Sequence, residues 1–359
     1  MKRLKALIFI AFAAGIAAIG IMPGCDELVT NEIRDSTTIT LIVRDSSCVE
    51  YCHSDNNFEV MAALRQWEHS GHSDTMFYDD TLYGQTGLYC GPQCHTMDGF
   101  VSALSNNPDT SGYPFELWCY TCHRPHTAQG PDSTWDFSLR TTSDVTLATG
   151  EVFSYGANGR SNICARCHRL TYNVINQVAV GILIDDNWLR KVRHAAQEAD
   201  MLMGAGGYEY AGYTYANSHE NVIQGCLGCH QDYDQGFTLG GHSLNIRDGN
   251  GNALVEECNR LGCHSGDEYS DSRIVGGQNV LHLFQLRALQ SKLLTAGLLD
   301  STTLLPPSSY TVIFNSDSAG ALYNYLYLTA DRSRGMHNMK YARDLLTSSI
   351  NFLDGTLGK

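Results

Sequence analysis

Apolar side chains recur at helical spacing in several stretches of this chain. Phe58, Met61, Leu64 and Trp67 would share one face of a helix, because residues three or four positions apart lie on the same side. Patterns of this kind predict five helices, at about 58–69, 185–203, 279–297, 318–329 and 338–353. Helices so short and so far apart leave much of the chain to irregular structure.

Turn-forming residues mark where these elements end. Asp185 and Asp186 would cap the second helix, and Gly204 would end it. The turn-rich stretch 128–160 predicts a hairpin, and the Gly- and Asn-rich segment 247–252 predicts a loop. No linker rich in Pro or Ser interrupts the chain. We therefore expect a mostly irregular, loop-rich fold with scattered α-helices and little β structure, built as one elongated domain over residues 25–359.

Composition indicates that side chains alone do not fill the interior. Hydrophobic residues make up 43% of the chain, but many of them are Ala, Tyr and Cys, and 34 residues are glycine. This is a poor composition for a conventional core in a chain of 359 residues. We expect a bound group to form the core in their place.

The formal charge of −14 bears on the kind of partner. It would repel phosphates, so we expect no nucleic-acid partner. A basic redox protein, a metal ion or a mineral surface suits this field better. In the alternative interpretation, the charge only keeps the protein in solution.

The N-terminus has the character of an export signal. Lys2, Arg3 and Lys5 form a positive region, an apolar run follows over 6–22, and residues 1–24 would be removed. Cys25 then stands where bacterial lipoproteins carry their acylated cysteine, although the residues before it fit that pattern imperfectly. A lipid anchor at Cys25 and an ordinary cleaved signal both remain open. No other stretch is apolar for long enough to cross a bilayer.

Cysteine spacing carries the chemistry. Of the 13 cysteines, all but Cys25 fall into six pairs, and a histidine directly follows the second cysteine of every pair. Plain C-x-x-C-H spacing is the signature of c-type haem attachment, in which both thiols bond to the haem and the histidine ligates the iron. Numbered along the chain, the plain motifs are motif 3 (Cys119, Cys122, His123), motif 4 (Cys164, Cys167, His168) and motif 5 (Cys226, Cys229, His230). The stretched ones are motif 1 (Cys48, Cys52, His53), motif 2 (Cys90, Cys94, His95) and motif 6 (Cys258, Cys263, His264).

Twelve cysteines could also serve in disulfides or in zinc sites. An exported protein could form six disulfides, but disulfides do not require a histidine after each second cysteine. Zinc needs four ligands at each site, and isolated Cys-Cys-His triplets do not supply them. The repeated triplet therefore predicts up to six haem c groups, with motifs 3, 4 and 5 carrying the stronger evidence.

Eight histidines lie outside these motifs. A haem iron held by two histidines needs a second, distal imidazole, so six haems would use six of the eight. The supply is therefore sufficient, and the eight are His69, His72, His126, His194, His219, His242, His282 and His337.

These motifs resemble those of the multihaem cytochromes of metal-respiring and related bacteria, including cytochromes that polymerise into extracellular filaments. The segment Trp67 to His72 is similar to a W-x-x-S-x-H segment whose last histidine is a ligand. The run from His123 to His126 resembles C-x-x-C-H-x-P-H, in which the second histidine ligates a neighbouring haem.

Four later segments also resemble ligand segments of that family. They are the stretch from His194 to Tyr210, His219 ahead of motif 5, Gly240-Gly241-His242, and Gly335-Met336-His337-Asn338 followed by Tyr341-Ala342. The resemblance thus implies six distal ligands: His72, His126, His194, His219, His242 and His337. It leaves His69 near a ligand or at the surface, and His282 packed against a core or a haem face.

Two histidines on every iron imply electron transfer, since neither axial position stays open for a substrate. The resemblance implies a role in the cell envelope or outside the cell, with other redox proteins or copies of the chain in a filament as partners. The alternative is an enzyme like the multihaem nitrite or hydroxylamine reductases, which keep one iron open. Some of these use lysine as the proximal ligand, and no cysteine here is followed by lysine. A haem-bearing scaffold or sensor is a third class.

Overall fold

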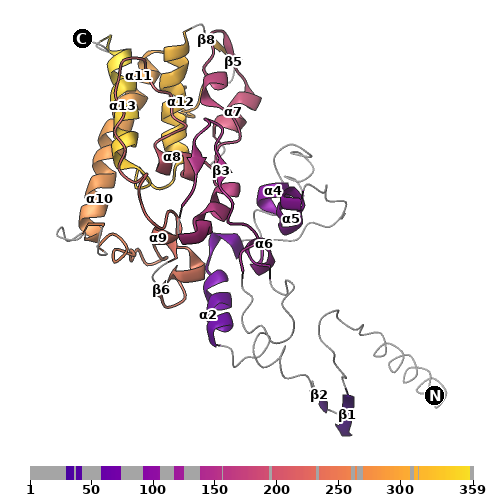
Figure 1. The fold of residues 1–359 in the computed structure, drawn as a ribbon. Coiled ribbons are helices and arrows are strands. Elements are labelled where there is room, and N and C mark those ends of the chain that lie inside the picture. The colour runs from indigo at the N-terminus through magenta and orange to yellow at the C-terminus, as the bar shows by residue number, and fades with distance from the viewer. Residues whose placement is uncertain are drawn as a thin grey trace, which may run out of the picture. The chain divides into compact units, whose positions relative to one another are not determined.

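The computed structural model describes thirteen stretches of the chain (Figure 1). They are residues 30–35, 38–42, 58–73, 92–105, 117–124, 138–155, 157–193, 196–231, 234–259, 263–264, 270–307, 311–313 and 315–355. Clustering of contacts gives two compact units, one of Met1–Arg65 with Arg124–Ser138 and one of Gln66–His123 with Leu139–Lys359. The predicted signal and Cys25 lie outside the described residues. Within the described part, no helix has the length and apolar character needed to cross a membrane.

The first unit contains a hairpin and the beginning of a helix. Strand β1 (Thr30–Asp35) pairs antiparallel with β2 (Thr38–Ile42), with a register shift between Ile33 and Asp35. Helix α2 (Phe58–Trp67) begins in this unit and ends in the second. It begins where the apolar spacing predicts and ends two residues earlier.

Short helical turns lie along the second unit up to residue 243, and several of them carry or adjoin haem motifs. These are η2 (Gly71–Ser73), α4 (Pro92–His95), α5 (Met97–Ser105), α6 (Cys119–Cys122), η4 (Ala157–Arg166), η5 (Val174–Gln177), α9 (Leu227–His230) and η6 (Gly241–Ser243). The strands are brief antiparallel pairs: β3 (Val145–Thr146) with β4 (Val152–Phe153), β5 (Ile182–Ile184) with β8 (Thr311–Ile313), and β6 (Asp234–Gln235) with β7 (Leu239–Gly240). The first pair lies in the stretch predicted as a hairpin.

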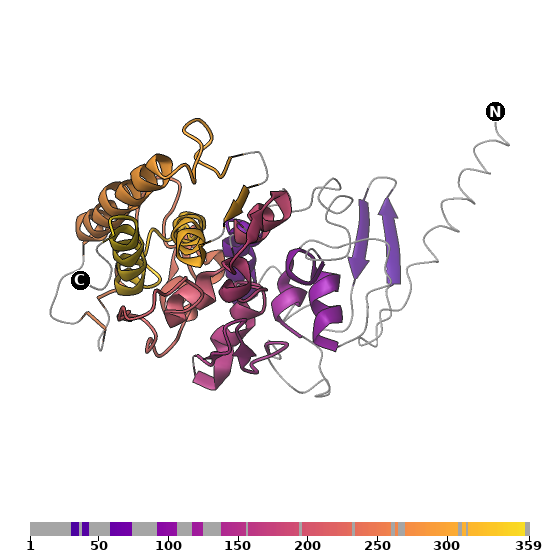
Figure 2. The same cartoon turned by 90° about the horizontal axis from the view of Figure 1, so that it is seen from above.

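Longer helices gather at the C-terminal end of this unit. A continuous helical run comprises α10 (Asp271–Asn279), the π-helical η7 (Val280–Leu286) and α11 (Arg287–Thr295). It begins eight residues before the predicted helix and contains His282. Helices α12 (Ser316–Ala330) and α13 (Met339–Leu353) match their predicted ranges within two residues. They stand side by side, next to α11, in both views (Figures 1 and 2).

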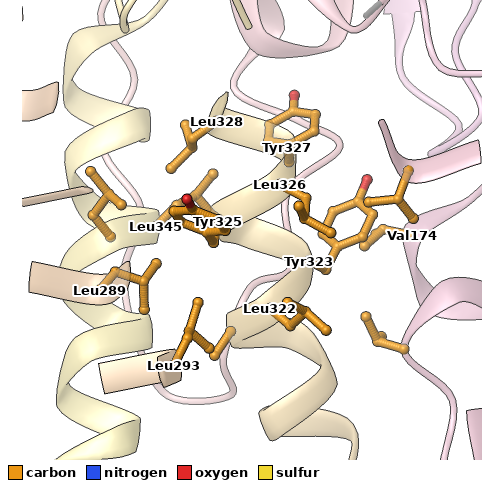
Figure 3. Close-up of a cluster of buried hydrophobic side chains, with 14 of the residues drawn as sticks. Val174, Leu289, Leu293, Leu322, Tyr323, Tyr325, Leu326, Tyr327, Leu328 and Leu345 are labelled. Carbon is orange, nitrogen blue, oxygen red and sulfur yellow. The ribbon is translucent and has the colours of Figure 1, made fainter. Parts of the chain in front are cut away.

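Apolar side chains between these helices form a core of their own. Leu289 and Leu293 of α11 meet Leu345 of α13 and Leu322 of α12, and all four are fully buried (Figure 3). This core also takes in buried tyrosines of α12, so side chains do fill this part of the interior. The loop-rich fold with scattered helices and little β structure is confirmed, and the helical core is an addition that composition did not predict.

The predicted helix at 185–203 is instead two helices, α7 (Asp186–Val192) and α8 (Glu198–Met203). Its predicted ends are correct: the Asp185 carboxylate accepts a hydrogen bond from the Trp188 amide, and Gly204 is left-handed with φ of 69°. Gln197, which directly precedes α8, is buried, and its side-chain amide donates to the Tyr327 carbonyl of α12 at 2.9 Å.

Candidate functional site

The haem motifs within the described residues fold as tight turns. In motifs 3, 4 and 5 the histidine amide donates to the carbonyl of the first cysteine, at 2.9, 2.9 and 3.0 Å. This bond brings both thiols and the imidazole to one side of a single helical turn. In motif 6 the His264 amide reaches the Cys258 carbonyl at 3.2 Å, although two extra residues intervene. The stretched motif therefore closes with the same pair of groups as the plain ones.

Three motif histidines face a second histidine from another part of the chain. The ring centres of His123 and His242 lie 6.1 Å apart, and those of His168 and His72 also lie 6.1 Å apart. The ring centres of His230 and His337 lie 6.4 Å apart. In each case one partner belongs to a motif, and the other belongs to a segment that resembles a distal-ligand segment.

These separations fit an iron between the two rings. Imidazole nitrogens bind first-row metals at about 2.0–2.1 Å and lie about 1.1 Å from the ring centre, so two rings on one metal have centres about 6.3 Å apart. The remaining ligands would come from the porphyrin, which the adjacent cysteines would hold. We call these pairs with their motifs centre 3 (motif 3 with His242), centre 4 (motif 4 with His72) and centre 5 (motif 5 with His337).

Hydrogen bonds at Nδ1 orient several of these rings. The Nδ1 of His230 lies 2.7 Å from the Leu244 carbonyl, and that of His337 lies 2.7 Å from the Asp331 carboxylate. The Nδ1 of His168 lies 3.4 Å from the Glu198 carboxylate. An imidazole that donates from Nδ1 presents the lone pair of Nε2, the form a metal requires.

Burial favours the neutral form of three of the histidine rings. Burial and, to a lesser extent, His168 lower the pKa of His72 to about 4. Burial likewise lowers the pKa values of His242 and His230. Metal ligation requires the neutral ring, so these groups are ready to bind at neutral pH.

A fourth pairing is indicated at motif 6. The Nδ1 of His219 lies 2.9 Å from the His337 carbonyl, and burial lowers the pKa of His219. His264 is close enough to lower that pKa further. We call motif 6 with His219 centre 6. The hydrogen bond joins His219 to the backbone of the segment that carries His337.

Cysteines from different motifs also meet. Hydrogen bonding between Cys94 and Cys167 lowers the pKa of Cys94 and raises that of Cys167. Hydrogen bonding between Cys164 and Cys226 lowers the pKa of Cys164 and raises that of Cys226. Charge on Cys164 contributes, after burial, to raising the pKa of Cys122 to about 12. Motif 4 therefore lies next to motifs 2, 3 and 5, and the cysteines that the structure describes, from Cys94 of motif 2 to Cys263 of motif 6, are free thiols.

Some predicted residues fall where the structure gives no description. Motif 1 (Cys48, Cys52, His53), Cys90 of motif 2 and the distal candidates His126 and His194 lie outside the described residues. His95 ends α4, and His69 is exposed, three residues before His72.

Two carboxylates beside the rings were not predicted from the sequence. Asp331 bonds to His337, and Glu198 lies beside His168. Burial opposes the charged form of Asp331, but the His337 ring and Ser333 outweigh it and lower the pKa of this carboxyl. No local sequence pattern marks either carboxylate. Its role depends on which histidine the fold brings near.

Comparison with curated proteins finds a relative that is present in two strains of one species. The C-type polyheme cytochrome OmcB of Geobacter sulfurreducens is 24% identical over 337 residues, a match that covers 74% of this chain and 44% of that protein. The chain thus matches less than half the length of this relative. No family model matches the chain.

Two solved structures are also similar. The outer cell wall cytochrome OcwA has a TM-score of 0.47 and 18% identity, over 80% of this chain and 49% of its own. An undecaheme cytochrome from the S-layer of Carboxydothermus ferrireducens has a TM-score of 0.45 and 15% identity, over 81% of this chain and 41% of its own. Haem-attachment motifs that fold as tight turns, histidine pairs at the span of an iron, and the match to a polyheme cytochrome lead to one conclusion: the chain is similar to multihaem c-type cytochromes.

Proposed function

We propose that this protein transfers electrons along a row of bis-histidine haem c groups. The observation that carries the proposal is the set of three imidazole pairs at 6.1, 6.1 and 6.4 Å, each joining a motif to a distant segment. A haem iron held by two of these imidazoles would keep both axial positions filled in either oxidation state, so little would have to reorganise when an electron arrives or leaves.

Contacts between motifs support an order for the row. Motifs 3 and 4 meet through Cys122 and Cys164, and motifs 4 and 5 meet through Cys164 and Cys226. Centres 5 and 6 meet through the hydrogen bond from His219 to His337. We propose the order 3–4–5–6, with the haem of motif 2 branching from centre 4 through Cys94 and Cys167.

The supply of distal ligands supports a count of six haems. Once centres 3, 4, 5 and 6 are assigned, His126 and His194 remain from the six predicted distal ligands, and motifs 1 and 2 remain without one. The numbers match, so the chain can provide both axial ligands for every motif. We propose that no ligand comes from a second copy, which favours a self-contained carrier over a filament subunit.

Closed irons also argue against the reductase alternative. In each of centres 3, 4 and 5 a second ring stands where a substrate would bind.

With the predicted signal at residues 1–24 and the charge of −14, we propose an exported carrier whose partners are cationic redox proteins or oxidised metal ions.

The test uses the mature holoprotein. Its mass counts the haems and detects an acyl group at Cys25, while visible and electron paramagnetic resonance spectra report the spin state. We expect six haems, low-spin signals throughout, stepwise reversible reduction, and no carbon monoxide binding after reduction. A high-spin signal or a carbon monoxide adduct in the wild-type protein would overturn the closed-site carrier and favour the enzyme.

A further inference from the structure

One distal ligand is bonded to a fully buried carboxylate. The Nδ1 of His337 lies 2.7 Å from Oδ1 of Asp331, whose side chain is 0% exposed. The Ser333 hydroxyl donates to the other carboxylate oxygen at 2.7 Å. The negative charge is therefore held out of water, next to the ring that would ligate the iron of centre 5.

The backbone holds this group of residues in place. Asp331 ends α12, its amide donating to the Tyr327 carbonyl at 3.1 Å. His337 lies two residues before α13, whose N-cap Asn338 is fully buried. The short connection between them turns through Gly335, with φ of 90°. Two long packed helices thus fix the distance between the carboxylate and the ring.

The other oriented rings have weaker acceptors. His230 and His219 lie against the neutral carbonyls of Leu244 and His337. The Glu198 carboxylate is 3.4 Å from His168, and that pair is more exposed, at 46% for His168 and 24% for Glu198. Among His168, His219, His230 and His337, the shortest and most buried carboxylate contact is therefore that of Asp331 with His337.

A carboxylate in this position acts on the iron through the ring. When the Asp331 carboxylate accepts a hydrogen bond from the Nδ1–H group, the imidazole becomes a stronger electron donor at Nε2. A stronger donor favours ferric over ferrous iron. The negative charge adds to this effect, because burial leaves it poorly screened. Asp331 would thus be a positioning residue that touches the ligand and not the iron.

Building on the proposed function, we propose that Asp331 lowers the reduction potential of centre 5 and makes it the lowest of centres 3 to 6. Electrons passing between centres 4 and 6 then cross centre 5 without resting there. The carboxylate that lowers this reduction potential lies in the connection between α12 and α13.

The test is a redox titration of the Asp331→Asn holoprotein, followed in the visible band and by electron paramagnetic resonance. Asparagine keeps the shape and one acceptor oxygen but removes the charge. We expect the lowest-potential component to rise until its ferrous-to-ferric ratio at a fixed potential is about tenfold higher, equivalent to about 59 mV for one electron. The low-spin signal of that haem should shift, while the number of haems stays the same.

The matched control is Asp317→Asn. Asp317 lies on the same helix, about 20 Å away along its axis at 1.5 Å per residue. The Asp317→Asn substitution removes the same charge far from His337. It should leave the potential of the lowest-potential component unchanged. Equal shifts in both variants would overturn the proposal, because they would reflect overall charge alone.

A second variant covers the case in which Asp331→Asn does not assemble. Ser333→Ala keeps the carboxylate but removes a hydrogen bond that neutralises part of its charge, so the lowest component should fall further. An unchanged titration in either assembled variant, or loss of low-spin ligation in Asp331→Asn, would refute a tuning role. These outcomes are separate from failure of the carrier function, which would appear as carbon monoxide binding in the wild-type protein.

Discussion

At the scale of single residues, position in the fold decides which histidine is a ligand candidate. His69 and His72 lie three residues apart in one segment, but His69 is exposed while His72 faces His168 at 6.1 Å. Burial also lowers the pKa of His72 to about 4, which favours the neutral ring that a metal requires. The family pattern W-x-x-S-x-H indicates the same choice.

This pair supplies a matched test of ligation. We expect His72→Ala to open the iron of centre 4, because the second ring is gone. One haem per chain should become high-spin and bind carbon monoxide after reduction, with the haem count unchanged. His69→Ala should leave all spectra as in the wild type. An equal effect of both substitutions would contradict the assignment of His72.

Asp200 is a second residue whose surroundings decide its behaviour. It is fully buried in α8, and burial raises the pKa of its carboxyl to about 7 despite a hydrogen bond from the Leu170 amide. A raised pKa in the folded state favours the protonated form. Its contribution to stability is therefore fullest below about pH 4 and is lost as the pH rises toward 7.

Asp200→Asn should remove this dependence, since asparagine does not ionise. The free energy of unfolding of the wild-type holoprotein should fall by up to about 4 kcal/mol relative to the variant between pH 4 and 7. Denaturant unfolding at several pH values measures this difference. The exposed Asp186→Asn serves as control, and parallel pH profiles for wild type and Asp200→Asn would contradict the prediction.

At the scale of elements, close packing of α12 holds the segment 206–210 against the core. The Tyr208 amide donates to the Asn324 side chain at 2.7 Å, and the Tyr323 hydroxyl donates to the Gly206 carbonyl at 2.8 Å. Gly320 lets the Tyr208 ring approach the helix, because a Cβ there would lie 1.9 Å from a ring carbon. The segment 206–210 belongs to the stretch from His194 to Tyr210, which resembles a ligand segment of multihaem cytochromes.

Two glycine substitutions separate packing from helix propensity. Gly320→Ala should destabilise the protein by about 1–3 kcal/mol, because the new methyl group meets the Tyr208 ring. Gly276→Ala in α10 meets nothing within 4 Å and should stabilise by about 0.5–1 kcal/mol through helix propensity. Thermal unfolding midpoints of the two holoproteins should therefore move in opposite directions. Movement in the same direction would argue against the close contact at Gly320.

At the scale of the whole molecule, charge and haem order act together in the proposed function. A formal charge of −14 gives a negative field around the protein, and haem propionates would add to it. The proposed row 3–4–5–6 needs a partner to come close to one of its haems. The field would favour cations in that encounter.

Rates of electron exchange with small redox complexes test this field. We expect oxidation by a cationic complex to be about tenfold faster or more than by an anionic complex of similar potential at low salt. Raising the ionic strength should slow the first reaction and speed the second, because salt screens both interactions. Rates that do not change with salt would count against a partner chosen by charge.

The sequence by itself determined the chemistry and the class of fold. Local patterns suffice for both: each attachment motif spans only a few residues, and apolar runs predict α12 and α13 within two residues. Contacts between distant residues are not written in such patterns. The bond from Gln197 to the Tyr327 carbonyl is one example, since the two residues lie 130 positions apart.

Only the tertiary structure decided which histidine faces which motif, how the motifs adjoin and where the carboxylates lie. His72 faces a motif nearly a hundred residues later, and His337 faces one more than a hundred residues earlier. The helical core of α11, α12 and α13 places Asp331 against His337. These pairings depend on how the chain packs, because a histidine ligand has no local signature that names its partner.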